Sequence, residues 1–234
     1  MDKNAIQAAM GEMTIFKDCS ANTLIDISKD IYVKNYKKGE IVLHDEGSNH
    51  RIAILASQGR IKIFTENEAA DEFILYCLVF GDIFNVITLL DEVKDSLRAA
   101  ALDDIVVFHC KIDMARGWIE KHHDFNKNLL KYISARLKLA QEFNIQKTFY
   151  SIELRLAKLI FDNLVIDENP LNLINNLSHE EIAKMLGTSR AVVNRNLQKL
   201  KQENLIYIKR KKILIKDYEK FAEYLSSFPD VFSV

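Results

Sequence analysis

One stretch near the end of the chain carries side chains that could recognise the edges of nucleic-acid bases. Arg190, Asn194, Arg195 and Gln198, together with Ala191, fall on one face of an expected helix, opposite its apolar residues. An arginine can donate two hydrogen bonds to guanine O6 and N7, and an asparagine or glutamine can pair with adenine N6 and N7. Because these residues lie near the amino-terminal end of the helix, the pattern predicts that this end reads bases in the major groove.

Two helices joined by a short turn must hold these side chains in place. Ser178 followed by Glu181 is a capping box, which begins a first helix, and Gly187 permits the tight turn that ends it. Ser189 can cap the second helix. The inward positions are apolar: Ile182, Ala183, Met185, Leu186, Val193, Leu197 and Leu200. This is a helix-turn-helix arrangement. The competing interpretation is an ordinary helical hairpin with a solvated charged face.

A basic β-hairpin is expected directly after the second helix. The runs 205–208 and 213–215 are strand-like. Four cations lie between them: Lys209, Arg210, Lys211 and Lys212. A hairpin with such a tip is a wing that can lie over the phosphate backbone and make binding depend on salt. Hydroxyls and lysines of the two helices are also expected at phosphates: Ser178, Lys184, Thr188, Ser189 and Lys199.

Charge is distributed unevenly along the 234 residues, although the formal net charge is only −1. Residues 1–120 carry 13 Lys and Arg against 20 Asp and Glu, whereas residues 171–234 carry 11 against 7. This imbalance indicates that only the end of the chain meets a polyanion. The three cysteines form no Cys-x-x-Cys motif, and neither a signal-peptide pattern nor an apolar run of ~20 residues is present. We therefore expect a cytoplasmic protein that does not enter a membrane.

The period of the hydrophobic pattern changes along the chain. Short apolar or alternating runs separated by turn-type residues lie at 41–43, 52–55, 61–64, 73–76 and 105–108. Their spacing predicts an antiparallel barrel or roll, preceded by a helix over about 20–29. From 125 to 150 there is neither Gly nor Pro, and apolar residues recur every three or four positions. This second pattern predicts one long helix.

The apolar residues of the long helix form a narrow stripe. Its members are Leu130, Ile133, Leu137 and Ala140. Their spacing of three, four and three is a heptad seam, which pairs helices in coiled coils. We favour a dimer helix because the other faces carry charged and polar side chains. The competing interpretation is a helix that packs against the core of its own domain.

The chain resembles the Crp/Fnr family of bacterial transcription regulators, which includes the cyclic-AMP receptor protein. The most specific match is 177–206, where Glu-Ile-Ala, Leu-Gly-Thr-Ser-Arg and Val-x-Arg recur in order. The resemblance implies an α+β fold in three parts. An N-terminal antiparallel β-roll of the cyclic-nucleotide-binding type, a double-stranded β-helix over 1–120, senses an effector. A dimerisation helix follows at 121–150, and a winged helix-turn-helix DNA-binding domain occupies 151–234.

The function implied by the resemblance is DNA binding by a homodimer under the control of a signal. The expected partners are double-stranded DNA with a pseudo-palindromic operator, a second copy of the chain, and RNA polymerase. Arg190 and Arg195 stand at the family's base-reading positions, whereas Ala191 replaces a glutamate that many members have. The wing also lacks the glycine often found at its turn. These departures put the usual half-site sequence and wing shape in doubt.

The effector cassette departs further from the family pattern. The matching positions are Gly81, Asp82, Asn85, Val86, Arg98 and Ala99. Arg98 matches the family's phosphate-binding arginine, although a purely structural role for it stays open. Asn85 and Val86 replace the Gly-Glu pair that meets the ribose, and Ala99 stands where a hydroxyl is usual. Because a buried nucleotide would lose several hydrogen bonds, we do not expect cyclic AMP to be the ligand.

The identity of the cofactor or effector stays unknown at this level. An iron–sulfur cluster needs about four thiolates, and Cys19 alone near the N-terminus cannot supply them. Haem needs fewer protein ligands and stays open as an alternative, as does a thiol switch. The candidate haem ligands are His44, His50, His109, His122, His123 and Cys110. For each of these histidines a surface or packed position is the more common role, and no metal site is predicted.

Two other function classes compete with DNA binding. An enzyme is not expected, because the chain has no Gly-rich phosphate loop, no His-Glu-x-x-His and no Gly-x-Ser-x-Gly. No catalytic residues are therefore assigned. A ligand-binding or assembly protein that never meets DNA would not need the four cations of the wing.

Overall fold

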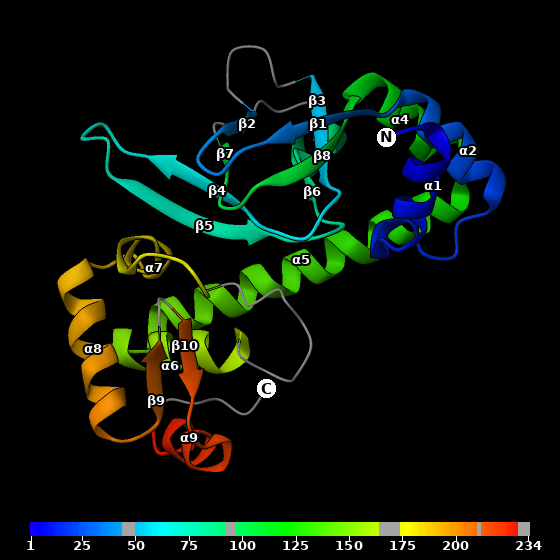
Figure 1. Ribbon diagram of the computed structural model, residues 1–234. Helices are drawn as coiled ribbons and strands as arrows, with labels where there is room; N and C mark the ends of the chain where they lie inside the picture. Colours follow the sequence, from blue (N-terminus) through cyan, green and yellow to red (C-terminus); the bar gives the residue numbers. More distant parts are fainter. Residues whose placement is uncertain (44–49, 92–96, 164–173, 210–211, 229–234) are drawn as a thin grey trace. The chain divides into compact units, whose positions relative to one another are not determined.

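The computed structural model describes residues 1–43, 50–91, 97–163, 174–209 and 212–228. The chain divides into two compact units. The first comprises residues 1–70 and 75–137, and the second comprises 71–74 and 138–234. Helix α5 (His123–Phe149) crosses this division, so that its first half belongs to the first unit (Figure 1).

The first unit is built on two four-stranded sheets. Their strands are β1 (Tyr32–Tyr36), β2 (Ile41–Leu43), β3 (Arg51–Leu55), β4 (Ile61–Glu66), β5 (Glu72–Leu78), β6 (Ile83–Phe84), β7 (Arg98–Ala101) and β8 (Ile105–Lys111). One sheet has the order β1-β8-β3-β6 and the other β2-β7-β4-β5. The β1–β8, β3–β8, β3–β6, β2–β7 and β4–β7 pairings are antiparallel. This is the antiparallel roll that the strand spacing predicted.

Alternation along the central strands separates two hydrophobic cores. On β3, Ala53 and Leu55 belong to a core shared by both sheets, whereas Ile52 and Ile54 belong to a second core outside the roll. Successive side chains of a strand point to opposite faces, so a strand covered on both faces needs an unbroken apolar run. This explains why residues 52–55 of β3 are all apolar rather than alternating with polar residues.

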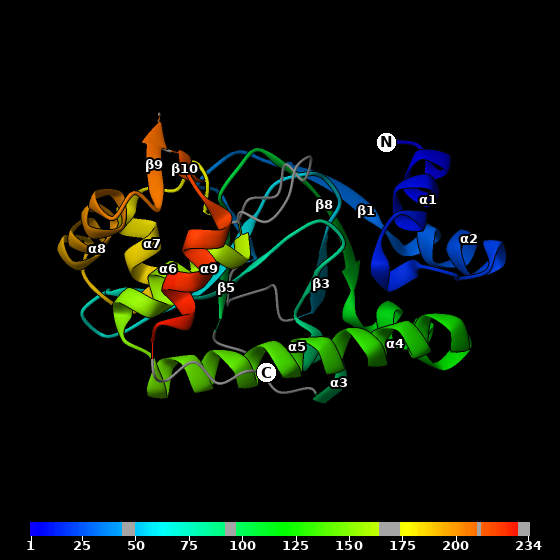
Figure 2. The ribbon, with the colours of Figure 1, turned by 90° about the horizontal axis from the view of Figure 1, so that it is seen from below.

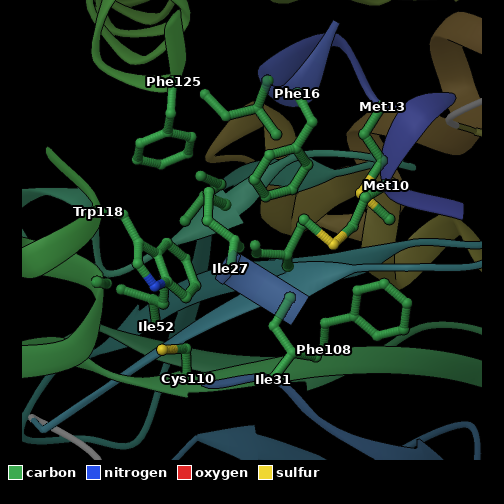
Figure 3. Close-up of a cluster of buried hydrophobic side chains, with 14 of the residues drawn as sticks. Met10, Met13, Phe16, Ile27, Ile31, Ile52, Phe108, Cys110, Trp118 and Phe125 are labelled. Atoms are coloured by element: carbon green, nitrogen blue, oxygen red, sulfur yellow. The ribbon is translucent and has the colours of Figure 1, made fainter. Parts of the chain in front are cut away.

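Helices fill the second core. The contributing elements are α1 (Lys3–Gly11), η1 (Thr14–Phe16), α2 (Ala21–Asp30), α3 (Val86–Asp91), α4 (Ile112–Lys121) and the start of α5. The ring of Phe125 stacks on Phe16 at 5.6 Å and meets the edge of Trp118 at 5.7 Å (Figure 3). Figures 1 and 2 both show α1, α2 and α4 gathered at one end of the roll. The predicted helix over 20–29 is confirmed as α2, with Ser20 as its N-cap.

Helix α5 confirms the predicted long helix and has two kinds of apolar side chain. Phe125 and Leu129 are buried in the second core, and Ile133 packs partly against it. Leu130 and Leu137 are instead 62% and 60% exposed. The helix therefore packs on its own unit and also presents an uncovered apolar stripe. Among the described helices, none is both long enough and apolar enough to span a membrane.

The described residues of the second unit form four helices and one hairpin besides the end of α5. The elements are α6 (Ile152–Asn163), α7 (His179–Leu186), α8 (Arg190–Gln202), β9 (Ile206–Lys209), β10 (Lys212–Ile215) and α9 (Tyr218–Ser226). Helices α7 and α8 pack against each other and against α6. The ring of Phe221, on α9, is fully buried and stacks on Phe161 at 5.7 Å. Burial of these helix faces fixes the direction in which α8 points its polar side.

Candidate nucleic-acid interface

The predicted caps and turn of the helix-turn-helix are present. The hydroxyl of Ser178 accepts from the Glu181 N–H at 3.1 Å, and the Glu181 carboxylate accepts from the Ser178 N–H at 2.6 Å. Gly187 ends α7 with a left-handed φ of 63°. Ser189 caps α8 through a 3.4 Å bond from the Val192 N–H. These local bonds set the angle at which α8 leaves the turn.

The two faces of α8 differ as its sequence predicted. Val193, Leu197 and Leu200 are fully buried. Four of the five predicted base-reading residues are exposed: Arg190, Ala191, Arg195 and Gln198. On α7, Ile182, Ala183 and Leu186 are buried, whereas Met185 is only partly so. Arg190 and Arg195 therefore stand on the solvent side of a helix whose opposite side is firmly packed.

Asn194 differs from the other predicted readers. It is half-buried, and its Oδ1 is hydrogen-bonded to Nδ1 of His179, the first residue of α7. Sequence analysis did not single out His179. The two residues are 15 positions apart on different helices, so no local spacing rule connects them.

The amino-terminal end of α8 carries a cation without an acidic neighbour in the same turn. Its first turn contains Arg190 and no acidic side chain. The free N–H groups of a helix start add a partial positive charge of their own. A cation in this place is unfavourable for an isolated helix, and it suits a surface that receives a polyanion.

Lys199 lies in a structural ion pair. Its ammonium donates to Glu153 of α6 at 2.7 Å, and the hydroxyl of Tyr224 on α9 donates to the same carboxylate. Burial alone would raise the pKa of Glu153, but these two hydrogen bonds bring it below its usual value. Lys199 therefore links three helices of the second unit, a role that its predicted contact with phosphate did not include.

The remaining predicted backbone contacts have different environments. Ser178 is exposed, yet its hydroxyl also donates to the Glu181 carboxylate at 2.9 Å, so the capping box uses its one donor. Ser189 is exposed, and Thr188 and Lys184 are half-buried. Ser178, Thr188 and Ser189 lie at or beside the ends of the two helices, and Lys184 lies in the last turn of α7.

The hairpin expected after α8 is present. Strands β9 and β10 pair antiparallel, with Lys209 directly opposite Lys212. Both lysines are exposed, whereas Arg210 and Lys211 lie outside the described residues. Like charges placed opposite each other on a hairpin weaken it. Two like charges in this place suit the binding of an anion better than they suit the folding of the hairpin.

Four residues of the predicted effector cassette lie in the β5–β6 turn and at the start of α3, and the other two, Arg98 and Ala99, lie on β7. Gly81 has a φ of 83°, and an added Cβ would lie 3.2 Å from the Cβ of Met13. The Asp82 carboxylate accepts from the Val79 N–H at 2.9 Å and lies 3.9 Å from Arg136 of α5. Asn85 is buried, with its amide donating to the Arg51 carbonyl at 2.9 Å. Val86 packs against the second core.

Arg98 is held by neighbours on β4. Its guanidinium donates to the Glu66 carboxylate at 2.5 Å and lies over the ring of Phe64 at 5.2 Å. Its Nε is buried and has no hydrogen-bond partner among the described residues. Ala99 is fully buried between β2 and β4, where it pairs with Leu43 and Ile63. The arginine is thus neutralised by a carboxylate of its own chain.

His109 is the buried histidine among the candidate haem ligands that the structure describes. Its Nε2 shares a 2.9 Å hydrogen bond with the Tyr36 hydroxyl, and Tyr32 stacks on its ring at 5.1 Å. Its Nδ1 is buried without a partner among the described residues. Burial lowers its pKa to about 4. An axial bond from Nε2 to iron would require the loss of the tyrosine contact.

The other candidate sensor residues are less enclosed or less reactive. His50 and His123 are exposed, His122 is half-buried beside Thr23, and His44 lies outside the described residues. Burial raises the pKa of the Cys19 thiol to about 11 and that of Cys110 to about 12. Thiols with raised pKa values carry little thiolate, which does not favour a cysteine switch. Within the described part of the chain, no His, Cys, Asp and Glu side chains form a group that could hold a metal ion.

Comparisons with known proteins agree with this architecture. Residues 154–224 match the family model of the Crp-like helix-turn-helix domain. A relative from Mycobacterium tuberculosis, a CRP-like cAMP-activated global transcriptional regulator, is 23% identical over 212 residues, which cover 89% of this chain and 94% of the relative. The curated relatives thus extend the match well beyond the helix-turn-helix.

Solved structures share the fold. A CooA variant from Carboxydothermus hydrogenoformans superposes with a TM-score of 0.69 and 22% identity, covering 89% of this chain and 92% of that one. A crp/fnr-family transcriptional regulator from Eubacterium rectale gives a TM-score of 0.70 and 18% identity, with coverage of 91% and 98%. Regulators of this family bind DNA, act as dimers and are not enzymes. Residues 154–224 therefore belong to the Crp-like helix-turn-helix domain family, and the comparisons over most of the chain support the Crp/Fnr family of transcription regulators.

Proposed function

We propose that two copies of this chain pair through α5 and that each α8 reads one half of a pseudo-palindromic operator. The observation that carries the proposal is the exposed face of α8, which has Arg190 and Arg195 toward its amino-terminal end and no acidic side chain in its first turn. A two-fold dimer would present these faces to successive major grooves about 34 Å apart. In this proposal RNA polymerase is the partner through which the bound dimer alters transcription.

Replacing both arginines tests this reading of bases. Each bidentate arginine–guanine contact is worth about 1–3 kcal/mol of discrimination. The Arg190→Ala, Arg195→Ala double variant should therefore lose its preference for an operator selected from random DNA, while its sedimentation stays that of the parent dimer. Arg51→Ala, an exposed arginine of the first unit, is the matched control. Unchanged operator affinity in the double variant would refute the proposal.

We further propose that the roll senses a signal other than cyclic AMP. The name of the Mycobacterium tuberculosis relative describes it as cAMP-activated. In this chain the Arg98 guanidinium is already hydrogen-bonded to the Glu66 carboxylate, and the buried Ala99 offers no hydroxyl. A phosphate would have to displace a carboxylate and would gain no replacement bond at Ala99. Calorimetric titration should detect no cyclic AMP binding, whereas a micromolar Kd would contradict this part of the proposal.

Haem is a separate hypothesis with a direct test. The hydrogen bond of His109 to Tyr36 and its stacking on Tyr32 do not favour it as an axial ligand. An absorption spectrum of anaerobically purified protein, recorded before and after haem addition, distinguishes the cases. A sharp Soret band with stoichiometric uptake would establish haem binding. A featureless spectrum would direct the search to a colourless organic effector.

A further inference from the structure

Lys199 lies beside the face of α8 that carries the predicted base-reading residues. It follows Arg195 by four residues, so the two side chains are about 40° apart around the helix axis and about 6 Å apart along it. Lys199 is exposed, whereas Val193 and Leu197, on another side of the helix, are fully buried. A lysine in this place borders any nucleic acid that reaches Arg195.

The charge of Lys199 is nevertheless already paired within the second unit. Its ammonium donates to the Glu153 carboxylate at 2.7 Å, and a hydrogen bond between charged groups is stronger than one between neutral groups. Glu153 lies in the first turn of α6, where the N–H groups of the helix start favour a carboxylate. Its side chain is 22% exposed, against 48% for Lys199. The carboxylate is therefore the more firmly held partner of the pair.

A third side chain fixes the carboxylate. The Tyr224 hydroxyl donates to the same oxygen, Oε1, that Lys199 bonds, and the tyrosine ring meets Phe221 and Phe228 edge-on at 6.2 and 5.2 Å. If Lys199 turned to a phosphate, Glu153 would stay in place as an unpaired carboxylate beside an anionic backbone. The move would lose the ion pair and add repulsion between like charges.

We infer that Glu153 withholds Lys199 from the DNA backbone and thereby limits the affinity of this chain for DNA of any sequence. As a pair, the two residues add no net charge to the surface beside Arg195, whereas an unpaired lysine would add one phosphate contact. The inference rests on the proposed function, because it requires the reading face of α8 to meet DNA.

The salt dependence of binding to random-sequence duplex DNA, measured with the full chain, tests the inference. Glu153→Gln keeps an acceptor for Tyr224 and removes the charge that holds Lys199. Its plot of log affinity against log salt concentration should be steeper than that of the parent chain by about one for each bound chain. At about 0.15 M salt, each added contact should tighten binding roughly fivefold. The Glu153→Gln, Lys199→Gln double variant lacks the pair altogether and should match the parent chain.

Glu219→Gln is the matched control, because Glu219 is an exposed acid in the first turn of α9, in the same unit. It removes the same charge and should leave the slope unchanged. Equal steepening in this control would assign the effect to net charge and overturn the inference. An unchanged slope in Glu153→Gln would also overturn it, since the released lysine would then reach no phosphate.

The double variant separates the inference from the sequence-based expectation that Lys199 contacts phosphate. A slope less steep than that of the parent chain would show that Lys199 already makes this contact beside Glu153, and the inference would be wrong. In that case the parent chain still binds DNA and the proposed function stands. A parent chain that binds no duplex DNA would refute the proposed function, and the inference with it.

A second measurement observes Lys199 directly. Nitrogen-15 NMR of the lysine side chains resolves their ammonium groups, and the Lys199 signal is the one absent from Lys199→Gln. Random-sequence DNA should shift this signal much less in the parent chain than in Glu153→Gln. Equal shifts in the two proteins would show that phosphate reaches Lys199 in the presence of Glu153, and would overturn the inference.

Discussion

The hydroxyl of Tyr132, on α5, bonds to both backbone polar groups of Ile83, on β6. It accepts from the Ile83 N–H at 3.1 Å and donates to the Ile83 carbonyl at 3.3 Å. Ile83 directly follows Asp82 of the predicted effector cassette, and Asp82 itself lies 3.9 Å from Arg136 of α5. Two contacts therefore join the cassette to the helix that carries the predicted dimer seam. A signal at the cassette has a short physical route to α5.

Removing the Tyr132 hydroxyl should destabilise the first unit. Tyr132→Phe leaves the N–H and carbonyl of Ile83 without this partner, at a cost of about 1–3 kcal/mol. Chemical denaturation followed by the fluorescence of Trp118, the single tryptophan, measures this unit directly. Tyr207→Phe, an exposed tyrosine of the second unit, should leave the transition unchanged. Equal midpoints for both variants would show that the Tyr132 contact contributes little.

The stability of the first unit should fall as the pH falls from about 6.5 toward 4. Burial lowers the pKa of His109 from 6.5 to about 4, so the unfolded chain binds a proton in this range before the folded chain does. The contribution is therefore complete above pH 6.5 and is lost on acidification, by about 3 kcal/mol at most.

A substitution separates the contribution of His109 to the pH dependence of stability from that of carboxylates, which bind protons in an overlapping pH range. His109→Gln can still bond the Tyr36 hydroxyl but has no proton to bind, so its stability should change less between pH 7 and pH 4.5. His50→Gln, at an exposed position, should behave as the parent chain does. The measurement is denaturant unfolding at each pH. A pH dependence that His109→Gln leaves unaltered would assign it to other groups.

The fold could be predicted where local pattern and tertiary environment agree. The apolar run of β3 and the Gly- and Pro-free stretch of α5 are examples. Strand β7 was missed because Arg-Ala-Ala-Ala has no strand propensity of its own, and only its place between β2 and β4 makes it a strand. Strand β6 has two residues, which is too few for any periodicity.

In the candidate site, too, contacts between residues close in sequence could be predicted, and contacts between distant residues could not. The caps at Ser178 and Ser189 depend on residues three positions apart, and both were predictable. The partners of Asn194, Lys199 and Arg98 lie 15, 46 and 32 positions away. Such contacts depend on how helices and strands pack, which one sequence does not reveal. Each such contact uses part of the hydrogen-bonding capacity of a side chain, while the residue keeps the position on its helix or strand that the sequence predicted.

Neutralising the described cations of the wing should weaken binding to all DNA sequences alike. A plot of log affinity against log salt concentration has a negative slope. The Lys209→Gln, Lys212→Gln double variant should make that slope less steep by about 2, since each phosphate contact contributes about one. Its thermal stability should not fall, because the two lysines are cross-strand neighbours of like charge. The Lys3→Gln, Lys17→Gln double variant removes the same charge from the first unit. If the salt dependence of that control became less steep by the same amount, the effect would come from the net charge of the protein and not from the wing.

A charge on the exposed stripe of α5 should separate dimerisation from folding. Leu137 is 60% exposed in the single chain, so Leu137→Glu should leave the unfolding midpoint of a monomer unchanged. In a paired seam the same change would bury a carboxylate against a second copy, which is strongly unfavourable without a partner cation. Sedimentation should therefore report a monomer, and operator affinity should fall with it.

Leu139 provides the matched control for this experiment. It is 54% exposed on the same helix, but two residues further on and hence about 200° around the axis from Leu137. Leu139→Glu should sediment as the parent dimer and retain operator binding. If instead Leu139→Glu dissociates the dimer and Leu137→Glu does not, the chains pair through a different face of α5, and the heptad assignment of Leu130, Ile133, Leu137 and Ala140 is wrong.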